Sequence, residues 1–97
     1  MSKHDFSALS AQYCGVIDQM PKSFTSHEFI LRLAQRNQAL YIEALYSYRR
    51  SPTPFQVLHG QLARHLKGYP KLVHYRGAVR SKNIFGGGNI CGQWTKV

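Results

Sequence analysis

The hydrophobic pattern of this chain changes its period at Pro70. Before that proline, apolar residues recur every three or four positions, which is typical of helices packed on one side. After it, Leu72–Arg76 and Ile90–Val97 are rich in β-branched and aromatic residues, which is typical of strands. Because the chain has only 97 residues, it has room for one modest core. The sequence therefore predicts one α+β domain over residues 1–97, with helices followed by a C-terminal β-hairpin.

The first two helices are predicted at about 6–20 and 26–48. Pro21 ends the first, since the residue before a proline avoids helical geometry. The second opens on Thr25-Ser26-His27-Glu28, a capping box in which the threonine hydroxyl and the glutamate carboxylate bond each other's backbone amides. Asn37-Gln38 interrupts its apolar stripe, so this segment is either one long helix or two helices with a bend.

A third helix is predicted at about 54–67. Thr53 is its expected cap, Pro54 suits the first helical position, and Gly68 follows its end. The residues expected to be buried recur every three or four positions: Phe55, Leu58, Leu62 and Leu66. The face of the helix opposite to these residues is mostly polar and carries no acidic residue.

The hairpin is predicted to have strands at about 72–76 and 90–97, joined by a long loop from Gly77 to Gly88. Ile84-Phe85, within this loop, is expected to fold back onto the core. Trp94 lies in a terminal strand that closes a small domain, and it is more readily explained as a core residue than as a stacking platform.

Charge is segregated along the chain. All four acidic residues lie in the first 43 positions, where four cations balance them, so the whole formal charge of +9 falls on residues 44–97. A compact surface with many cations and no carboxylate repels itself, and a polyanionic partner explains it most directly. A merely soluble basic domain is the alternative, although solubility does not require the charges to be segregated.

Several classes of protein are disfavoured by what the sequence lacks. No apolar run approaches the roughly 20 residues of a membrane span, and no signal peptide is recognisable, which favours the cytoplasm. Cys14 and Cys91 form no metal-ligand pair and are expected to be ordinary thiols. The basic half has no carboxylates for acid–base catalysis, and the histidines do not have ligand spacing. We therefore expect no enzyme activity, no metal and no cofactor.

The order of the elements resembles the winged helix-turn-helix superfamily. The resemblance depends on the capped opening Phe24–Glu28, on the opening Thr53–Gln56, and on a glycine-rich basic hairpin that closes on Trp94. It implies that the helix at 54–67 enters the major groove of double-stranded DNA, while the hairpin, as the wing, contacts an adjacent backbone or the minor groove.

The chemistry of the candidate DNA-binding residues agrees with this resemblance. Glutamine can form bidentate hydrogen bonds with adenine and arginine with guanine, and cations in the turn and the hairpin can hold phosphates. Gly60 on the outward face would allow a backbone to approach closely. The candidates are Arg49, Arg50, Gln56, Gln61, Arg64, Lys67, Arg76, Arg80 and Lys82.

Two other functions remain open at this point. The same scaffold can serve as an adaptor for a protein partner or form a homodimer through its near-neutral N-terminal half, since fold does not settle function. RNA binding is a weaker alternative, in which aromatic stacking would matter more. The expected role within the DNA-binding hypothesis is that of a small regulator of transcription or an accessory factor.

Overall fold

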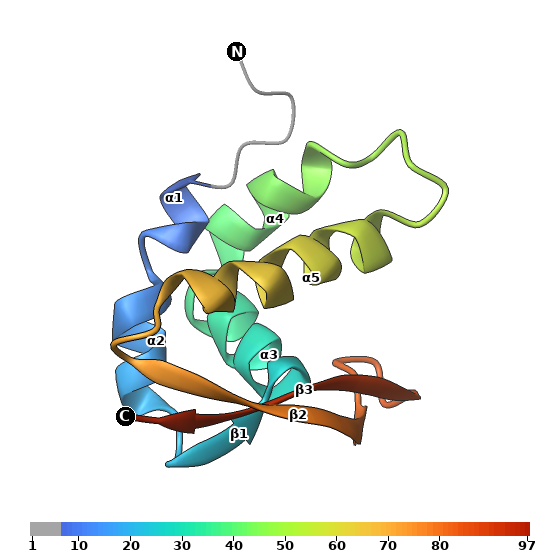
Figure 1. Cartoon of the computed structure of the whole chain (residues 1–97). Helices are drawn as coiled ribbons and strands as arrows, with labels where there is room; N and C mark the ends of the chain where they lie inside the picture. Colours follow the sequence, from blue (N-terminus) through green and yellow to red (C-terminus); the bar gives the residue numbers. More distant parts are fainter. Residues whose placement is uncertain (1–6) are drawn as a thin grey trace.

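The polypeptide folds into helices that lie on one side of a three-stranded antiparallel sheet, so the predicted α+β class is confirmed (Figure 1). This computed structural model describes residues 7–97. The strands β1 (Ser23–Thr25), β2 (Val73–Lys82) and β3 (Gly88–Lys96) are ordered β1-β3-β2. Because β3 is central, it joins a short strand of the N-terminal half to the C-terminal hairpin.

The helix predicted at 6–20 consists of α1 (Ser7–Ser10) and α2 (Tyr13–Gln19). Its first residue lies outside the described residues. The two helices are separated by a tighter turn, in which the amide of Gln12 donates to the carbonyl of Leu9 at 3.0 Å. Met20, before Pro21, is extended as predicted, with ψ at 154°.

The segment predicted at 26–48 is two helices, α3 (Ser26–Arg36) and α4 (Gln38–Tyr46), with Asn37 between them. The backbone of Asn37 is not helical, and its side-chain amide donates to the carbonyl of Leu33 at 3.2 Å. The predicted capping box is confirmed: Glu28 N donates to Thr25 Oγ1 at 3.1 Å, and Thr25 N donates to Glu28 Oε1 at 2.8 Å.

The third predicted helix is α5 (Pro54–His65), followed by the 3₁₀ turn η1 (Leu66–Gly68). Leu58, Leu62 and Leu66 are fully buried as expected. The prediction for Phe55 was wrong, because its ring is 40% exposed. It lies in the first turn of α5, beyond the end of the core. The predicted cap was also wrong, since the side chain of Thr53 makes no capping hydrogen bond.

The predicted hairpin had strands that were too short and a loop that was too long. β2 continues through the glycine at position 77, which lies at a β-bulge after Arg76 and has a positive φ of 112°. The sequence reasoning took this glycine as the start of a loop, whereas it only kinks the strand. The predicted loop at 77–88 therefore shrinks to residues 83–87 between β2 and β3.

The short hairpin loop is organised by Asn83. Its Oδ1 accepts from the amides of Phe85 at 2.9 Å and Gly87 at 3.1 Å, and its own amide donates to the carbonyl of Gly87 at 2.8 Å. Ile84 packs against the core as predicted, but Phe85 is 63% exposed. The loop therefore holds one apolar residue inward and the next one outward.

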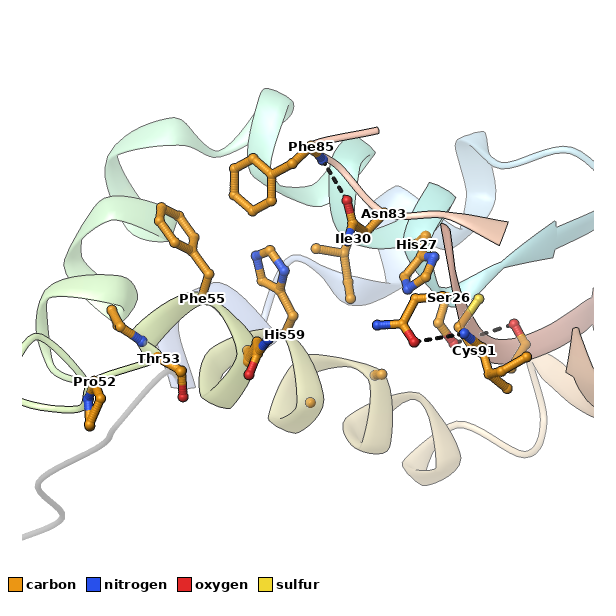
Figure 2. Close-up of a pocket in the computed structure, with 17 residues that line it drawn as sticks. Ser26, His27, Ile30, Pro52, Thr53, Phe55, His59, Asn83, Phe85 and Cys91 are labelled. Carbon is orange, nitrogen blue, oxygen red and sulfur yellow. Dashed lines mark hydrogen bonds between the residues drawn. The ribbon is translucent and has the colours of Figure 1, made fainter. Parts of the chain in front are cut away.

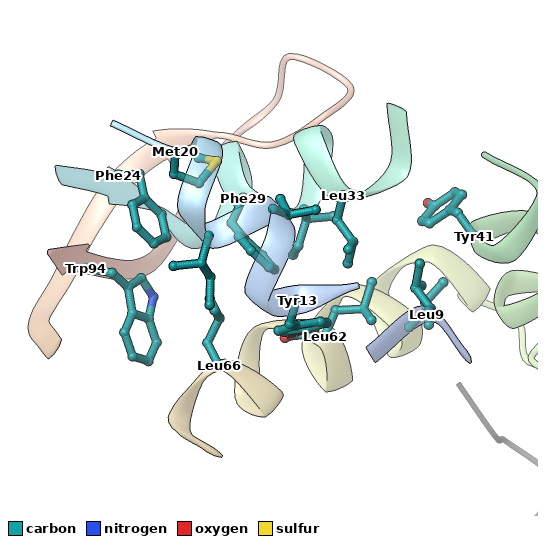
Figure 3. Close-up of a cluster of buried hydrophobic side chains, with 14 of the residues drawn as sticks. Leu9, Tyr13, Met20, Phe24, Phe29, Leu33, Tyr41, Leu62, Leu66 and Trp94 are labelled. Atoms are coloured by element: carbon teal, nitrogen blue, oxygen red, sulfur yellow. Dashed lines mark hydrogen bonds between the residues drawn. The ribbon is translucent and has the colours of Figure 1, made fainter. Parts of the chain in front are cut away.

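The hairpin is fixed to the helices by Trp94, which is buried as predicted (Figure 3). Trp94 pairs across the sheet with Phe24 of β1 and Tyr75 of β2, and its Nε1 donates to Ser26 Oγ at 2.8 Å. A Cβ on Gly92 would lie 2.9 Å from the Trp94 Nε1, so only glycine fits beside this indole. The base of the hairpin is thus part of the core.

Two threonines that precede helices provide a matched test of the capping assignment. Thr25→Ala removes an acceptor from the first turn of α3, and we expect it to lower the free energy of unfolding by about 1 kcal/mol. Thr53→Ala removes no capping hydrogen bond from α5, and we expect a change below about 0.5 kcal/mol. Urea unfolding of both variants checks this. If both variants lose the same free energy of unfolding, Thr25 does not cap α3 more strongly than Thr53 caps α5.

Candidate nucleic-acid interface

A cavity of about 710 Å³ lies between α5, the start of α3 and the outer part of the hairpin (Figure 2). We call it the α5–hairpin cavity. In Figure 1 the first turn of α5 and the hairpin tip lie at the same end of the molecule. The residues that line the α5–hairpin cavity come from four segments: Ser26, His27 and Ile30; Pro52–Gln56; His59, Gly60 and Ala63; and Asn83, Phe85 and Asn89–Gly92.

One stripe of α5 runs along this cavity. Gln56, Gly60 and Arg64 are four residues apart, so they share one side of the helix, and we call them the α5 stripe. Gln56 and Gly60 line the cavity, while Arg64 is exposed one turn further on. A Cβ on Gly60 would meet no atom within 4 Å, so packing inside the protein does not require glycine there. The stripe is therefore open to a partner.

Lys67 and Gln61, the other two candidates on or next to α5, lie in different places relative to the α5 stripe. Lys67 is exposed in η1, three residues beyond the α5 stripe. Gln61 is half-buried, does not line the cavity, and lies on the other side of Arg64 around the helix. The structure therefore brings Gln56, Arg64 and Lys67 together along one edge and leaves Gln61 apart from them.

Two of the hairpin cations lie on β2 beside residues that line the cavity. Arg80 pairs across the strands with Ile90, and Lys82 pairs with Gly88. Side chains alternate along a strand, so Ile90 and Gly88 share the face of the buried Trp94, and their cross-strand partners share it too. Ile90 also lines the cavity. Asn89 and Cys91, on the other face of β3, line it as well, whereas the exposed side chains of Arg80 and Lys82 do not, so these two cations lie on the hairpin next to the cavity and outside its lining.

Arg76 lies elsewhere. Its Nε donates to Thr95 Oγ1 at 3.0 Å. Thr95 is next to Trp94 along β3 and so belongs to the opposite face of the sheet. The sequence reasoning grouped Arg76 with Arg80 and Lys82, because the bulge at Arg76 could not be recognised.

Arg49 and Arg50 are exposed in the turn before α5. The guanidinium of Arg49 lies 4.1 Å from the centre of the Tyr46 ring, a cation–π contact, and its Nη1 donates to the Tyr46 carbonyl at 3.2 Å. Pro52 and Thr53 of the same turn line the cavity. The turn therefore borders the cavity near the start of α5, with Arg49 already held by a neighbour.

An aromatic cluster at the cavity was missed by the sequence reasoning. The rings of Phe55 and Phe85 meet edge to face with centroids 4.8 Å apart, and the imidazole of His59 lies parallel to Phe85 at 6.2 Å (Figure 2). Phe55 and His59 are four residues apart on α5, a spacing that the sequence does contain. Their partner Phe85 is distant in the chain, so no local pattern could join them.

Burial shifts the pKa of the cavity residue His59 and that of its hydrogen-bond partner Tyr41. Burial, and to a lesser extent the nearby His27, lowers the pKa of His59 to about 4, so this imidazole is neutral at pH 7. Its Nε2 lies 2.6 Å from the Tyr41 hydroxyl, and burial raises the pKa of Tyr41 to about 12. The tyrosine therefore stays protonated and can donate to the imidazole.

His27, in the first turn of α3, also lines the cavity. Its Nδ1 is buried and finds no hydrogen-bond partner among residues 7–97. A buried polar atom without a partner is costly and uncommon in proteins, so this atom is a candidate for contact with a ligand.

The part of the chain that the structure describes holds no group of three His, Cys, Asp or Glu side chains arranged to bind a metal ion. Cys14 is an exposed free thiol, and Cys91 is a half-buried one at the cavity. No helix within residues 7–97 has the length and apolar character needed to cross a membrane.

Comparisons of the chain with protein-family models, curated proteins and solved structures find no match. What this surface can do is therefore inferred from its own residues and geometry.

The depressed pKa of His59 predicts how stability changes with pH. The unfolded chain binds a proton at this site near pH 6.5 and the folded one only near pH 4, so the unfolded state is favoured as pH falls between them. We expect the free energy of unfolding to drop over this interval by about 1–2 kcal/mol, since solvent screens the half-buried ring.

Urea unfolding at pH 7 and pH 4.5 measures this drop. His59→Gln should reduce it, while His74→Gln, which changes an exposed histidine of β2, should leave it unchanged. If the free energy of unfolding of the His59→Gln variant drops as much as that of the wild-type protein, His59 is not the cause of the drop.

Proposed function

We propose that this protein is a non-catalytic double-stranded DNA-binding protein with a winged helix-turn-helix arrangement, acting as a small regulator or accessory factor. One observation carries the proposal. Gln56 and Gly60 of the α5 stripe line the α5–hairpin cavity together with Asn83, which follows Lys82, and Ile90, which pairs with Arg80, and this part of the chain has no acidic residue.

The connectivity supports this arrangement. The hairpin follows α5 after only a 3₁₀ turn and a short connection, and it pairs with β1 in the order β1-β3-β2. In a winged helix, the helix before the hairpin enters the major groove and the hairpin contacts the adjacent backbone. With α5 in the groove, Arg80 and Lys82 would extend the same contact surface onto the phosphates.

Each candidate then has a chemical role. Gln56 and Arg64 on the α5 stripe are suited to base edges, glutamine to adenine and arginine to guanine. Lys67, Arg80, Lys82 and the turn residue Arg50 are suited to phosphates, which fix the register without reading sequence. Arg49, Arg76 and Gln61 have secondary roles in this proposal, since Arg49 and Arg76 are engaged by other residues and Gln61 lies off the stripe.

Affinity for DNA should fall steeply with salt. If roughly six phosphates are contacted, a plot of log affinity against log salt concentration has a slope of about −5, because bound counterions are released. Electrophoretic mobility shifts from 50 to 300 mM salt measure this slope (~0.9 per phosphate). Binding that does not depend on salt, or no binding at any salt concentration, would contradict the proposal.

Two variants in the same salt series separate the roles. Arg80→Ala should weaken all sequences alike and reduce the slope by about 1, while Arg64→Ala should alter the sequence preference in a selection from random duplexes. Arg36→Ala, at the exposed end of α3, removes one charge away from the cavity and serves as the control. Identical behaviour of the Arg64 and Arg80 variants would show that the groove assignment is wrong.

The exposed face of α4 favours a second candidate function. Ile42 and Tyr46 are four residues apart on one side of α4 and are 63% and 62% exposed. Large apolar side chains that adjoin each other on a surface are typical of protein contacts. An adaptor or a homodimer would use this face, which belongs to the near-neutral half of the chain.

Light scattering after size-exclusion chromatography tests the homodimer. If α4 is the contact, the protein is a dimer at micromolar concentration and Ile42→Glu converts it to a monomer that keeps its DNA affinity. If the wild-type protein stays a monomer at every concentration up to about 100 μM, the free energy of dimerisation is weaker than about −5.5 kcal/mol, which argues against a dimer.

A further inference from the structure

We propose that the α5–hairpin cavity takes an unpaired nucleobase of the bound DNA, with the flanking phosphates held by the cations at its rim. The inference rests on the proposed function and makes it more specific. It predicts a preference for DNA that contains a bulged or otherwise unpaired base over a fully matched duplex.

The lining of the cavity is neutral but rich in hydrogen-bonding groups. None of its residues is an acid, a lysine or an arginine, whereas amide side chains are contributed by Gln56, Asn83 and Asn89. His59 is neutral at pH 7, because burial lowers its pKa to about 4. A neutral heterocycle with donors and acceptors on its edge suits such a lining better than a charged ligand does.

The aromatic side chains supply the stacking surface. Phe85 is 63% exposed and Phe55 is 40% exposed, and both line the cavity. The domain core is formed by other side chains, which are buried. The rings of Phe55 and Phe85 are not part of it and are free to contact a ligand in the cavity. Stacking of a base on such a ring is worth about 1–3 kcal/mol and tolerates any base.

His27 provides a specific polar contact. Its Nδ1 is buried, lacks a partner among residues 7–97, and belongs to a residue that lines the cavity opposite α5 (Figure 2). An entering base can satisfy this atom through its hydrogen-bonding edge. The cavity volume of about 710 Å³ lies within the range of small-ligand sites and is ample for one base.

The charge distribution around the cavity favours a nucleotide within a strand. Three exposed cations adjoin lining residues: Lys82 precedes Asn83, Arg64 follows Ala63, and Arg80 pairs across the hairpin with Ile90. A neutral interior with a cationic rim matches a base whose phosphates stay outside. Since extrusion from the stack costs least for a base that is already unpaired, such DNA should bind most tightly.

Fluorescence anisotropy with three labelled DNAs tests the proposal. These are a matched duplex, the same duplex with a single bulged adenosine, and the same duplex with a bulged abasic site. We expect the adenosine bulge to bind about tenfold more tightly than the other two. The abasic site is the control for flexibility, because it bends as a bulge does but offers no base.

Variants of two equally exposed aromatic residues locate the effect. Phe85→Ala should abolish the preference for the adenosine bulge over the matched duplex, while Phe85→Tyr should retain it. Tyr46→Ala is the matched control, since Tyr46 is 62% exposed on α4 and does not line the cavity. Circular dichroism and urea unfolding establish that each variant is folded.

The outcomes separate this inference from the proposed function. Equal binding of all three DNAs, an abasic bulge that binds as tightly as the adenosine bulge, or a preference that persists in Phe85→Ala overturns the inference alone. Absence of binding to every DNA overturns the proposed function as well. Saturable binding of free deoxyadenosine monophosphate at the cavity, without discrimination among the DNAs, would show that the site takes a free nucleotide instead.

Discussion

The packing of Trp94 against Phe24 and Ser26 is the contact on which the candidate interface depends. It joins the central strand of the sheet to β1 and to the first residue of α3, and it brings the indole N–H onto a buried hydroxyl. Gly92 leaves the room that the indole needs. Because a close-packed core has few alternative arrangements, this joint sets the direction in which the hairpin leaves the helices. The relation of Arg80 and Lys82 to α5 follows from that direction.

Burial of one side of α5 determines what its other side can do. Leu58, Leu62 and Leu66 are fully buried, and the hydroxyl of Tyr13 donates to the carbonyl of Leu62 at 2.6 Å. The helix therefore cannot rotate about its axis without exposing these leucines, which would cost several kcal/mol. Gln56 and Arg64 are held outward as a consequence. Since residues 44–97 contain no acid, no carboxylate of this half competes with a bound anion for these cations.

Local patterns in the sequence predicted the elements well and the contacts between them poorly. The capping box at Thr25, the burial of Leu58, Leu62 and Leu66 and the burial of Trp94 each depend on neighbouring residues or on composition, and each is confirmed. The length of β2 was underestimated, because a glycine at a bulge and a glycine in a loop look alike in a sequence. The Phe55–Phe85 contact joins residues 30 positions apart, so it required the fold. The winged-helix resemblance and the DNA-binding role stay predictions.

The base and the tip of the hairpin are held by different kinds of contact. At the base, Trp94 is 3% exposed and its hydrogen bond is buried, so displacement there would disrupt the core. At the tip, Phe85 meets Phe55 at an exposed edge-to-face contact of the kind worth about 0.5–1.5 kcal/mol. A partner that stacks on either ring can replace that contact with one of similar strength. The tip is therefore the part of the interface that can adjust to a partner, while the base keeps the hairpin fixed to the helices.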